Sequence, residues 1–294
     1  MLPETKPIVP NFIELLEEIY EKEDAKYVEK EGYRHNPSNA SLLKEDGKAV
    51  GACIRALYYK ATKEPVTDKK ALTVKLQGDF GNGIHDQLYK VLKKSDKIKL
   101  TSELPGKVLV DSLTQEVSYR LDGVVDHKGE SGYLELKTMQ SFALRNMVMK
   151  GGPRDRDVLQ VLVGLGVNPE LRWGSLVYLG RDNAYRAQYN IYKDPDLGVY
   201  MIQGIVPPAR PKPIKELTFK KVVERWKELE GHVERKELPK RDYKAVLKKD
   251  GTLTDKREKN LVSYETDKAC LYCSWKSRCW TLPDAMEECV QIDR

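Results

Sequence analysis

Three charged side chains in the segment RLDGVVDHKGESGYLELKT have the types and spacing that metal-assisted hydrolysis requires. Asp122 falls near the end of one expected strand, and Glu135 and Lys137 fall on the next. Strand alternation places Glu135 and Lys137 on one face, and a hairpin would bring Asp122 alongside Glu135. Two such carboxylates suit Mg²⁺ or Mn²⁺, and the Lys137 ammonium could orient or help deprotonate an attacking water.

The same three side chains could instead form a purely structural ion pair. Both acids lie inside apolar strand sequences, RLDGVV and YLELKT, where an unpaired charge is costly unless something cationic meets it. We therefore favour metal ligation over the structural ion pair.

A histidine upstream of these strands is a third candidate ligand. In FGNGIHDQLYKVL, Gly81 and Gly83 loosen the expected start of an amphipathic helix, and His85 follows them. A helical histidine is often only packed or solvent-facing, but neutral imidazole binds Mn²⁺ and is tolerated beside Mg²⁺. In combination with the acidic pair, we favour His85 as a ligand.

The cysteines form a second candidate metal site. CLYCSWKSRC places Cys270, Cys273 and Cys279 in a compact triplet of the kind that soft metals bind. Cys53 is the natural fourth ligand, and Cys289 is left over. Structural Zn²⁺ fits this spacing, but one distant cysteine with a triplet favours a 4Fe-4S cluster. Either metal would close a very long loop and so stabilise the fold, and we expect no redox catalysis.

The elements that must position these residues follow from the hydrophobic periodicity. Helical spacing predicts one helix upstream of the acidic strands and another after them, and short alternating runs predict the strands. This order indicates an α/β or α+β core. The expected helices are 11–30, pieces within 40–62, 78–95, 154–167 and 214–238, and the expected strands lie within 98–137 and within 172–193, joined around 180–183.

Composition narrows the class of protein. The 294 residues are 40% hydrophobic, enough for a substantial core, and 51 Lys and Arg exceed 45 Asp and Glu by six, a weak sign of a polyanionic partner. A secretory leader or membrane-spanning run is not expected, so we predict a soluble protein of the cytoplasm of a prokaryote or of a viral host. Five cysteines in such a protein do not indicate a disulfide framework.

Taken together, these motifs resemble the RecB-type branch of the PD-(D/E)XK nuclease superfamily over roughly residues 50–285. The resemblance rests on Gly81 to His85, on RLDGVV, on Glu-Leu-Lys and on a following helix that carries Gln160. It implies an α/β, restriction-endonuclease-like core, with a mixed central sheet flanked by helices, plus helical additions and a C-terminal cysteine cluster.

The resemblance also assigns roles to individual residues. It implies that His85, Asp122, Glu135 and the backbone carbonyl of Leu136 bind the metal, that Lys137 assists the attacking water, and that the helix of Gln160 lies against DNA. Family members usually carry Gln-x-x-x-Tyr on that helix, whereas Gly164 stands here at the tyrosine position, which leaves the role of Gln160 open. An aromatic contact would then come from another residue, such as Tyr178.

The cysteine pattern is similar to that of the iron–sulphur RecB-like nucleases, which include the CRISPR-associated adaptation nuclease, the AddB subunit and related phage exonucleases. The similarity extends to Arg55 and Tyr59 after the first cysteine. It implies a Mg²⁺- or Mn²⁺-dependent deoxyribonuclease in replication, recombination or repair that attacks DNA of single-stranded character from an end. An endonuclease, a CRISPR spacer-processing nuclease and a catalytically inactive DNA-binding scaffold remain alternatives. The DNA contacts expected from proximity in sequence are Arg145, Lys150, Arg154, Arg156, Tyr178 and Arg181.

The domain organisation expected from these patterns has four parts. They are an N-terminal helical extension at 1–50, the nuclease core at 51–204, a helical, basic insertion at 205–265 and a cysteine segment at 266–294 that packs back on Cys53.

Overall fold

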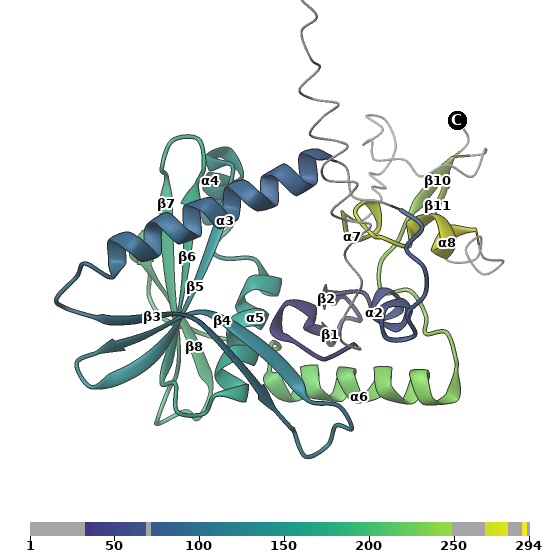
Figure 1. The fold of residues 1–294 in the computed structure, drawn as a ribbon, viewed down its shortest axis with the longest axis horizontal. Helices are drawn as coiled ribbons and strands as arrows, with labels where there is room; N and C mark the ends of the chain where they lie inside the picture. The colour runs from purple at the N-terminus through teal and green to yellow at the C-terminus, as the bar shows by residue number, and fades with distance from the viewer. Residues whose placement is uncertain (1–32, 69–71, 249–267, 282–289, 293–294) are drawn as a thin grey trace, which may run out of the picture.

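A mixed seven-stranded sheet forms the centre of the larger part of the molecule, on the left in Figure 1. The computed structural model describes residues 33–68, 72–248, 268–281 and 290–292. The strands lie in the order of the chain; β5 and β6 run parallel, and the other neighbours are antiparallel. The strands are β3 (Lys99–Val108), β4 (Val117–His127), β5 (Glu130–Met139), β6 (Trp173–Gly180), β7 (Arg186–Lys193), β8 (Tyr200–Val206) and β9 (Lys212–Pro213).

The one parallel pair explains the helices between β5 and β6. Parallel neighbours cannot be joined by a tight turn, so the chain crosses over through α4 (Ser141–Met149) and α5 (Asp155–Val167). β5 is buried continuously from Gly132 to Leu136, as expected of a strand covered on both faces.

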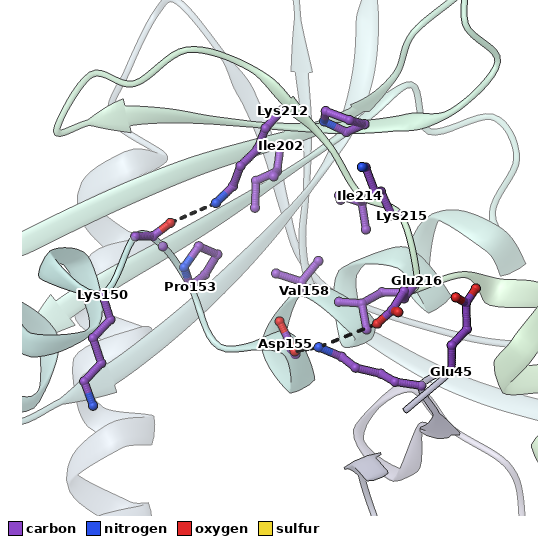
Figure 2. A pocket seen from close by; sticks show the side chains of 15 residues that line it. Glu45, Lys150, Pro153, Asp155, Val158, Ile202, Lys212, Ile214, Lys215 and Glu216 are labelled. Carbon is purple, nitrogen blue, oxygen red and sulfur yellow. Dashed lines mark hydrogen bonds and ion pairs between the residues drawn. The ribbon is translucent and has the colours of Figure 1, made fainter. Parts of the chain in front are cut away.

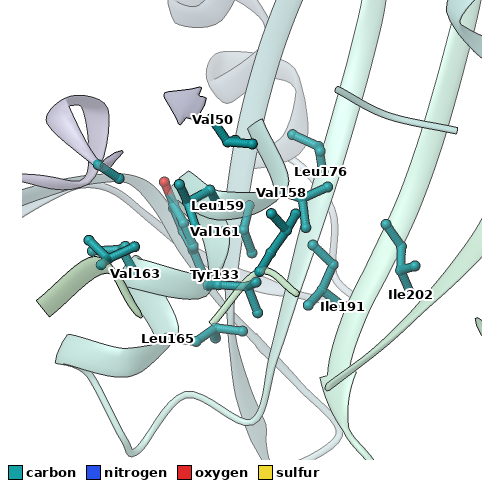
Figure 3. Packing of buried hydrophobic residues seen from close by; sticks show 14 of the residues in the cluster. Val50, Tyr133, Val158, Leu159, Val161, Val163, Leu165, Leu176, Ile191 and Ile202 are labelled. Carbon is teal, nitrogen blue, oxygen red and sulfur yellow. The ribbon is translucent and has the colours of Figure 1, made fainter. Parts of the chain in front are cut away.

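Helix α5 fills one face of the sheet. Its apolar residues surround the helix on most sides, and Leu162 is fully buried. Leu159 and Val161 are fully buried as well and lie in the apolar cluster shown in Figure 3. The long helix α6 (Phe219–Arg235) joins the same core through Val222 and Trp226, neither of which is exposed. The described residues of the expected insertion at 205–265 therefore do not form a separate helical unit. They include the end of β8, the short strand β9 at the edge of the sheet, and α6, which is part of the core.

The opposite face of the sheet carries α3 (Leu72–Leu92), which lies across the strands (Figure 1). Tyr89 of this helix is buried with Leu100, Val125, Leu134 and Leu136. The sheet is thus sandwiched between α5 and α3, and the acidic strands β4 and β5 lie between them.

A smaller unit with its own apolar core lies beside α6 (Figure 1). In its core, Tyr59 and Leu57 of α2 (Ile54–Ala61) pack with Leu229 of α6 and with Cys279 and Trp280 of α8 (Lys276–Trp280). The unit also contains α7 (Lys268–Leu271) and the parallel strands β10 (Val246–Lys248) and β11 (Val290–Ile292).

The N-terminal region differs from the expected helices. A short 3-10 helix, η1 (Pro37–Asn39), precedes a hairpin of β1 (Ser41–Leu43) and β2 (Ala49–Gly51), so helix begins only at Ile54. The hairpin turn uses Gly47 at a φ of 77°, a left-handed conformation that favours glycine. The helix expected at 11–30 lies outside the described residues. Among the described helices, we find none that is both long enough and apolar enough to cross a membrane.

Candidate active site

The register of β4 and β5 brings the two predicted acids together. Gly123 pairs with Leu134, so the preceding residue of β4, Asp122, lies beside Glu135. The carboxylate of Asp122 accepts a hydrogen bond from the backbone N–H of Leu136 at 3.1 Å. Since the N–H and C=O of a strand residue point toward the same neighbouring strand, the Leu136 carbonyl faces the Asp122 side. Three oxygen donors predicted as metal ligands therefore lie along one short stretch of two strands.

Glu135 is completely buried at this position. Its carboxylate accepts a hydrogen bond from the Tyr133 hydroxyl and forms an ion pair with Lys137. Burial raises the pKa of Glu135 to about 8; the charge of Lys137 opposes this rise, and that of Asp122 adds to it. A buried carboxylate with a second carboxylate beside it is the setting in which a further cation stabilises the ionised form.

Lys137 connects the acidic strands to α5. Its ammonium donates a hydrogen bond to Oε1 of Gln160 at 2.9 Å and pairs with Glu135. Burial disfavours the charged ammonium, but the neighbouring carboxylate of Glu135 outweighs this and raises the pKa of Lys137. The lysine is therefore held as a cation between β5 and α5.

His85 lies on α3, near enough to Asp122 and Lys137 for their charges to affect it, but in the described residues it does not form a three-ligand group with the two acids. The charges of Asp122 and Lys137 both act on it, but desolvation is the largest influence and lowers the pKa of His85. At neutral pH the imidazole is therefore uncharged, which is the form that binds metals. His85 lies well inside α3, so Gly81 and Gly83 do not mark a helix start as expected. A Cβ at Gly81 would lie 3.3 Å from the Thr138 hydroxyl, so this glycine permits the close approach of α3 to β5.

Two residues that the sequence analysis did not single out also border the acids. Tyr89, one turn beyond His85, is buried, and its hydroxyl has no hydrogen-bond partner within the described structure. Its pKa is raised by burial and by the charges of Asp122, Glu135 and Glu103. Glu103 of β3 has no paired residue on β4, although both of its chain neighbours do. Its φ is 51°, a conformation that non-glycine residues rarely adopt. An orphaned hydroxyl beside three carboxylates fits a site that binds a hydrated cation.

The described side chains do not by themselves complete a metal cage. Among residues 33–68, 72–248, 268–281 and 290–292, no group of three His, Cys, Asp or Glu side chains is close enough to hold an ion. Mg²⁺ needs few protein ligands and keeps waters and substrate oxygens, so two acids and a backbone carbonyl suit it better than a closed cage.

A steric contact explains why glycine is required at position 164, where the RecB-type nucleases that the motifs resemble usually carry tyrosine. A Cβ at Gly164 would lie 2.8 Å from the ring of Tyr133, so that ring occupies the space beside α5. The aromatic hydroxyl at the site therefore comes from Tyr133 of β5. The expectation that Tyr178 contacts DNA is wrong, because this side chain is not exposed at all and its hydroxyl donates to Asp157 at 2.7 Å.

The other predicted DNA contacts are distributed around the ends of β5, β6 and α5. Arg154 and Arg156 are at the start of α5, and Arg145 of α4 lies over the ring of Tyr185 at 5.2 Å. Arg181 follows β6 directly, and its backbone N–H donates to Met139 of β5.

Lys150 borders a hollow of about 640 Å³ beside the start of α5 (Figure 2). There Lys44 pairs with Asp155 at 2.6 Å, and Lys212 donates to the carbonyl of Gly151 at 2.9 Å. This hollow contains none of the predicted metal ligands.

The four predicted cysteine ligands border one cavity, although in the described residues no three of them are close enough to hold an ion. Cys53, Cys270, Cys273 and Cys279 line one small cavity of about 20 Å³, and none of them forms a disulfide. Burial raises the pKa of Cys53 to about 11 and also raises that of Cys273. Thiols in such surroundings stay protonated unless a metal binds them, because coordination deprotonates a thiol. Cys289 lies outside the described residues.

Basic and aromatic side chains enclose this cavity. Arg241 donates from Nε to the sulphur of Cys279 at 3.2 Å and lies 4.5 Å from the centre of the Trp280 ring. Arg55 and Tyr59 also line it. N–H donors to sulphur stabilise thiolates, so the donor set and its surroundings fit a thiolate-bound metal.

Comparisons with known proteins give only distant similarities. No family model matches the chain, and no curated protein matches it. Among solved structures, the protein SSO0001 is 16% identical, with a TM-score of 0.47 and coverage of 92% of this chain and 96% of its own. An alkaline exonuclease, LHK-Exo from Laribacter hongkongensis, is 13% identical with a TM-score of 0.40, over 62% of this chain and 80% of its own. The same exonuclease in complex with dAMP gives 11% identity and a TM-score of 0.38, over 62% and 78%.

Proposed function

We propose that this chain is a Mg²⁺- or Mn²⁺-dependent deoxyribonuclease with a PD-(D/E)XK-type core. The observation that carries the proposal is the convergence of Asp122, Glu135 and Lys137 on β4 and β5, with Gln160 reaching them from α5. The resemblance of the motifs to the RecB-type nucleases supports the same reaction.

Each residue has a distinct part in this proposal. The carboxylates of Asp122 and Glu135 and the carbonyl of Leu136 would hold the cation, and the imidazole of His85 would complete the ligand set from α3. Lys137, held as an ammonium by Glu135 and Gln160, would orient the attacking water and stabilise negative charge that develops on the phosphate. When bound, the cation would polarise the scissile phosphate and stabilise the leaving oxygen.

We further propose that Cys53, Cys270, Cys273 and Cys279 hold a 4Fe-4S cluster, with structural Zn²⁺ as the alternative. The shared cavity and the N–H donors to sulphur support a thiolate-bound metal of either kind. Such a metal would fasten α2 to α7 and α8 and so contribute to stability.

The substrate proposed is DNA with single-stranded character, attacked from a free end. Positive residues near the site, among them Arg145, Arg154, Arg156 and Arg181, would neutralise phosphates. An endonuclease active in recombination or CRISPR spacer processing would use the same acids, because the catalytic motif does not determine where a strand is cut.

Incubation with internally labelled linear and circular DNA, single- and double-stranded, tests this function. The proposal predicts that linear single strands are degraded with Mg²⁺ or Mn²⁺ and remain intact in EDTA. Cleavage of circles would establish the endonuclease instead. If no DNA is cut under any of these conditions, the catalytically inactive scaffold is the correct description.

A further inference from the structure

A second pocket continues from the acidic site along α5. It has a volume of about 230 Å³ and is lined by Lys137 and Gln160 together with Arg154, Arg156 and Asp157 at the start of α5. The rest of its lining consists of Pro37 and Ser38 of η1, Gly51 of β2, and the adjoining Ala40 and Ala52. We refer to this as the arginine pocket. Because Lys137 and Gln160 belong to both sites, a ligand in the arginine pocket lies next to the acidic pair.

A buried carboxylate fixes the two arginines. Asp157 is only 3% exposed; it accepts a hydrogen bond from the Tyr178 hydroxyl at 2.7 Å and one from Nε of Arg154 at 2.6 Å. Nε of Arg156 lies 3.5 Å from its other oxygen. These contacts use the Nε atoms, so the terminal Nη groups keep their donors for another acceptor. The side chains remain 38% and 62% exposed, which leaves them accessible.

The charge of the pocket selects an anion. Lys137, Arg154 and Arg156 contribute three positive charges, and Asp157, the one acid of the lining, is already engaged by the arginines. Planar guanidinium groups bind phosphate oxygens through paired N–H donors. The arginine pocket therefore has the chemistry of a phosphate site.

The size of the pocket limits which phosphate can enter. A volume of about 230 Å³ is smaller than the ~300–1,000 Å³ typical of sites for drug-sized ligands, so it accommodates one phosphate-bearing group. A terminal phosphate is bonded to one nucleoside only and carries about one more negative charge than a phosphodiester near neutral pH. It therefore matches this volume and these three cations better than a phosphate in the middle of a strand does.

We propose that the arginine pocket binds the terminal phosphate of a DNA strand whose scissile bond lies at Asp122 and Glu135. This inference rests on the proposed nuclease function and names the form of substrate that the site prefers. Asp157 is a positioning residue in this account, because it acts through the two arginines.

Binding of DNA ends without catalysis tests the proposal. The full chain carrying Asp122→Asn is titrated in EDTA into internally labelled single-stranded oligonucleotides that end in a 5′-phosphate, in a 3′-phosphate or in hydroxyls only. One phosphate-ended form should bind about tenfold more tightly than the hydroxyl-ended form, the gain expected of charge-assisted hydrogen bonds. Equal affinities for all three would overturn the proposal, since backbone phosphates alone would then account for binding.

Matched arginine variants locate the effect. Arg154→Gln and Arg156→Gln should each remove most of the preference, whereas Arg172→Gln, at an exposed position at the other end of β6, should retain it. Arg154→Gln also removes a partner of the buried Asp157, so a folding defect is checked by thermal unfolding. Arg156 makes a longer contact with Asp157 from a more exposed side chain, so Arg156→Gln tests the pocket with less risk to folding. A preference that survives Arg156→Gln in a folded protein would refute the assignment.

The proposed nuclease activity and the proposed terminal-phosphate pocket can be refuted independently of each other. Wild-type protein that cleaves DNA with Mg²⁺ but binds all ends equally would refute the terminal-phosphate pocket and leave the nuclease. Protein that prefers phosphate ends but never cleaves would refute the nuclease and leave the pocket.

Discussion

The ammonium of Lys137 lies between the carboxylate of Glu135 and the amide oxygen of Gln160, and its hydrogen bond to that oxygen is 2.9 Å long. This contact joins the strand that carries the acids to the helix proposed to face DNA. The amide thus fixes the direction of the amine that would assist the attacking water.

Substitution of Lys137 and substitution of Gln160 should therefore both lower the rate of cleavage, but to different extents. Lys137→Ala removes the ammonium that would orient the attacking water and stabilise the developing charge, and should reduce kcat by about 10²–10³. Gln160→Ala keeps the Lys137 ammonium but removes the amide oxygen that accepts its hydrogen bond. This variant should reduce kcat by about tenfold, with a smaller change in KM. Steady-state cleavage assays measure both, with Lys193→Ala, at the exposed end of β7, as the control. Unchanged kcat in Gln160→Ala would show that the amide has no positioning role.

The burial of Glu135 predicts a pH dependence of stability in metal-free protein. Its folded pKa is raised to about 8, so between about pH 5 and pH 8 the folded state keeps a proton that the unfolded state has lost. Stability from this group is present at low pH and is lost as the pH rises through 8. The melting temperature in EDTA should fall over this range, by roughly 2–4 °C for each kcal/mol of unfolding free energy that is lost.

Two comparisons isolate this effect. Mg²⁺ or Mn²⁺ should raise the melting temperature more at pH 8 than at pH 6, because the cation favours the ionised carboxylate. Glu135→Gln has no proton to lose, so its melting temperature should depend less on pH and should gain little from the metal. An equal metal response at both pH values would argue against cation binding at Glu135.

The close packing of Gly164 against Tyr133 gives a third prediction. Gly164→Ala places a methyl group 2.8 Å from the Tyr133 ring and so disturbs the hydroxyl that donates to Glu135. Overpacking of this kind costs about 1–3 kcal/mol, and we expect lower cleavage as well. Gly83→Ala in α3 is the matched control, since a Cβ there meets nothing within 4 Å and should stabilise the helix by about 0.5–1 kcal/mol. Chemical denaturation measures both, and equal effects of the two substitutions would contradict the packing argument.

The cysteine cavity makes a prediction about metal content. Protein purified without oxygen should be brown, with iron and sulphide in similar amounts, and Cys53→Ser or Cys273→Ser should lose both and unfold at lower temperature. Cys289→Ser should retain the metal, because this cysteine is the one left over. A colourless protein that contains zinc would replace the cluster with a structural zinc site, and a protein without any bound metal would refute both.

Much of the fold followed from periodicity, because both faces of a central sheet impose strong patterns on sequence. The strands within 98–137 and 172–193 and the helix at 154–167 are confirmed, since their apolar residues face the helices on either side. The hairpin at β1 and β2 was missed because its three-residue strands are too short to show alternation. Its apolar residues, such as Leu42 and Val50, match helical spacing equally well.

The site itself was only partly accessible from sequence. The spacing of Asp122, Glu135 and Lys137 was informative because strand geometry translates it directly into position. Tyr133 and Asp157 were not found, because their roles depend on which side chains meet them across elements. A signal for Tyr133 was present all the same: glycine at position 164 indicates that another group fills the space beside the helix.

Cleavage by matched carboxylate variants tests the central claim most directly. Wild type, Asp122→Asn and Glu135→Gln are compared in single-turnover digestion of end-labelled single-stranded DNA with Mn²⁺, alongside their affinity for the same DNA in EDTA. The account predicts that both variants bind DNA as tightly as wild type within a few-fold and cleave it at least a thousandfold more slowly. Cleavage by either variant at the wild-type rate would show that the acids on β4 and β5 do not form the catalytic site.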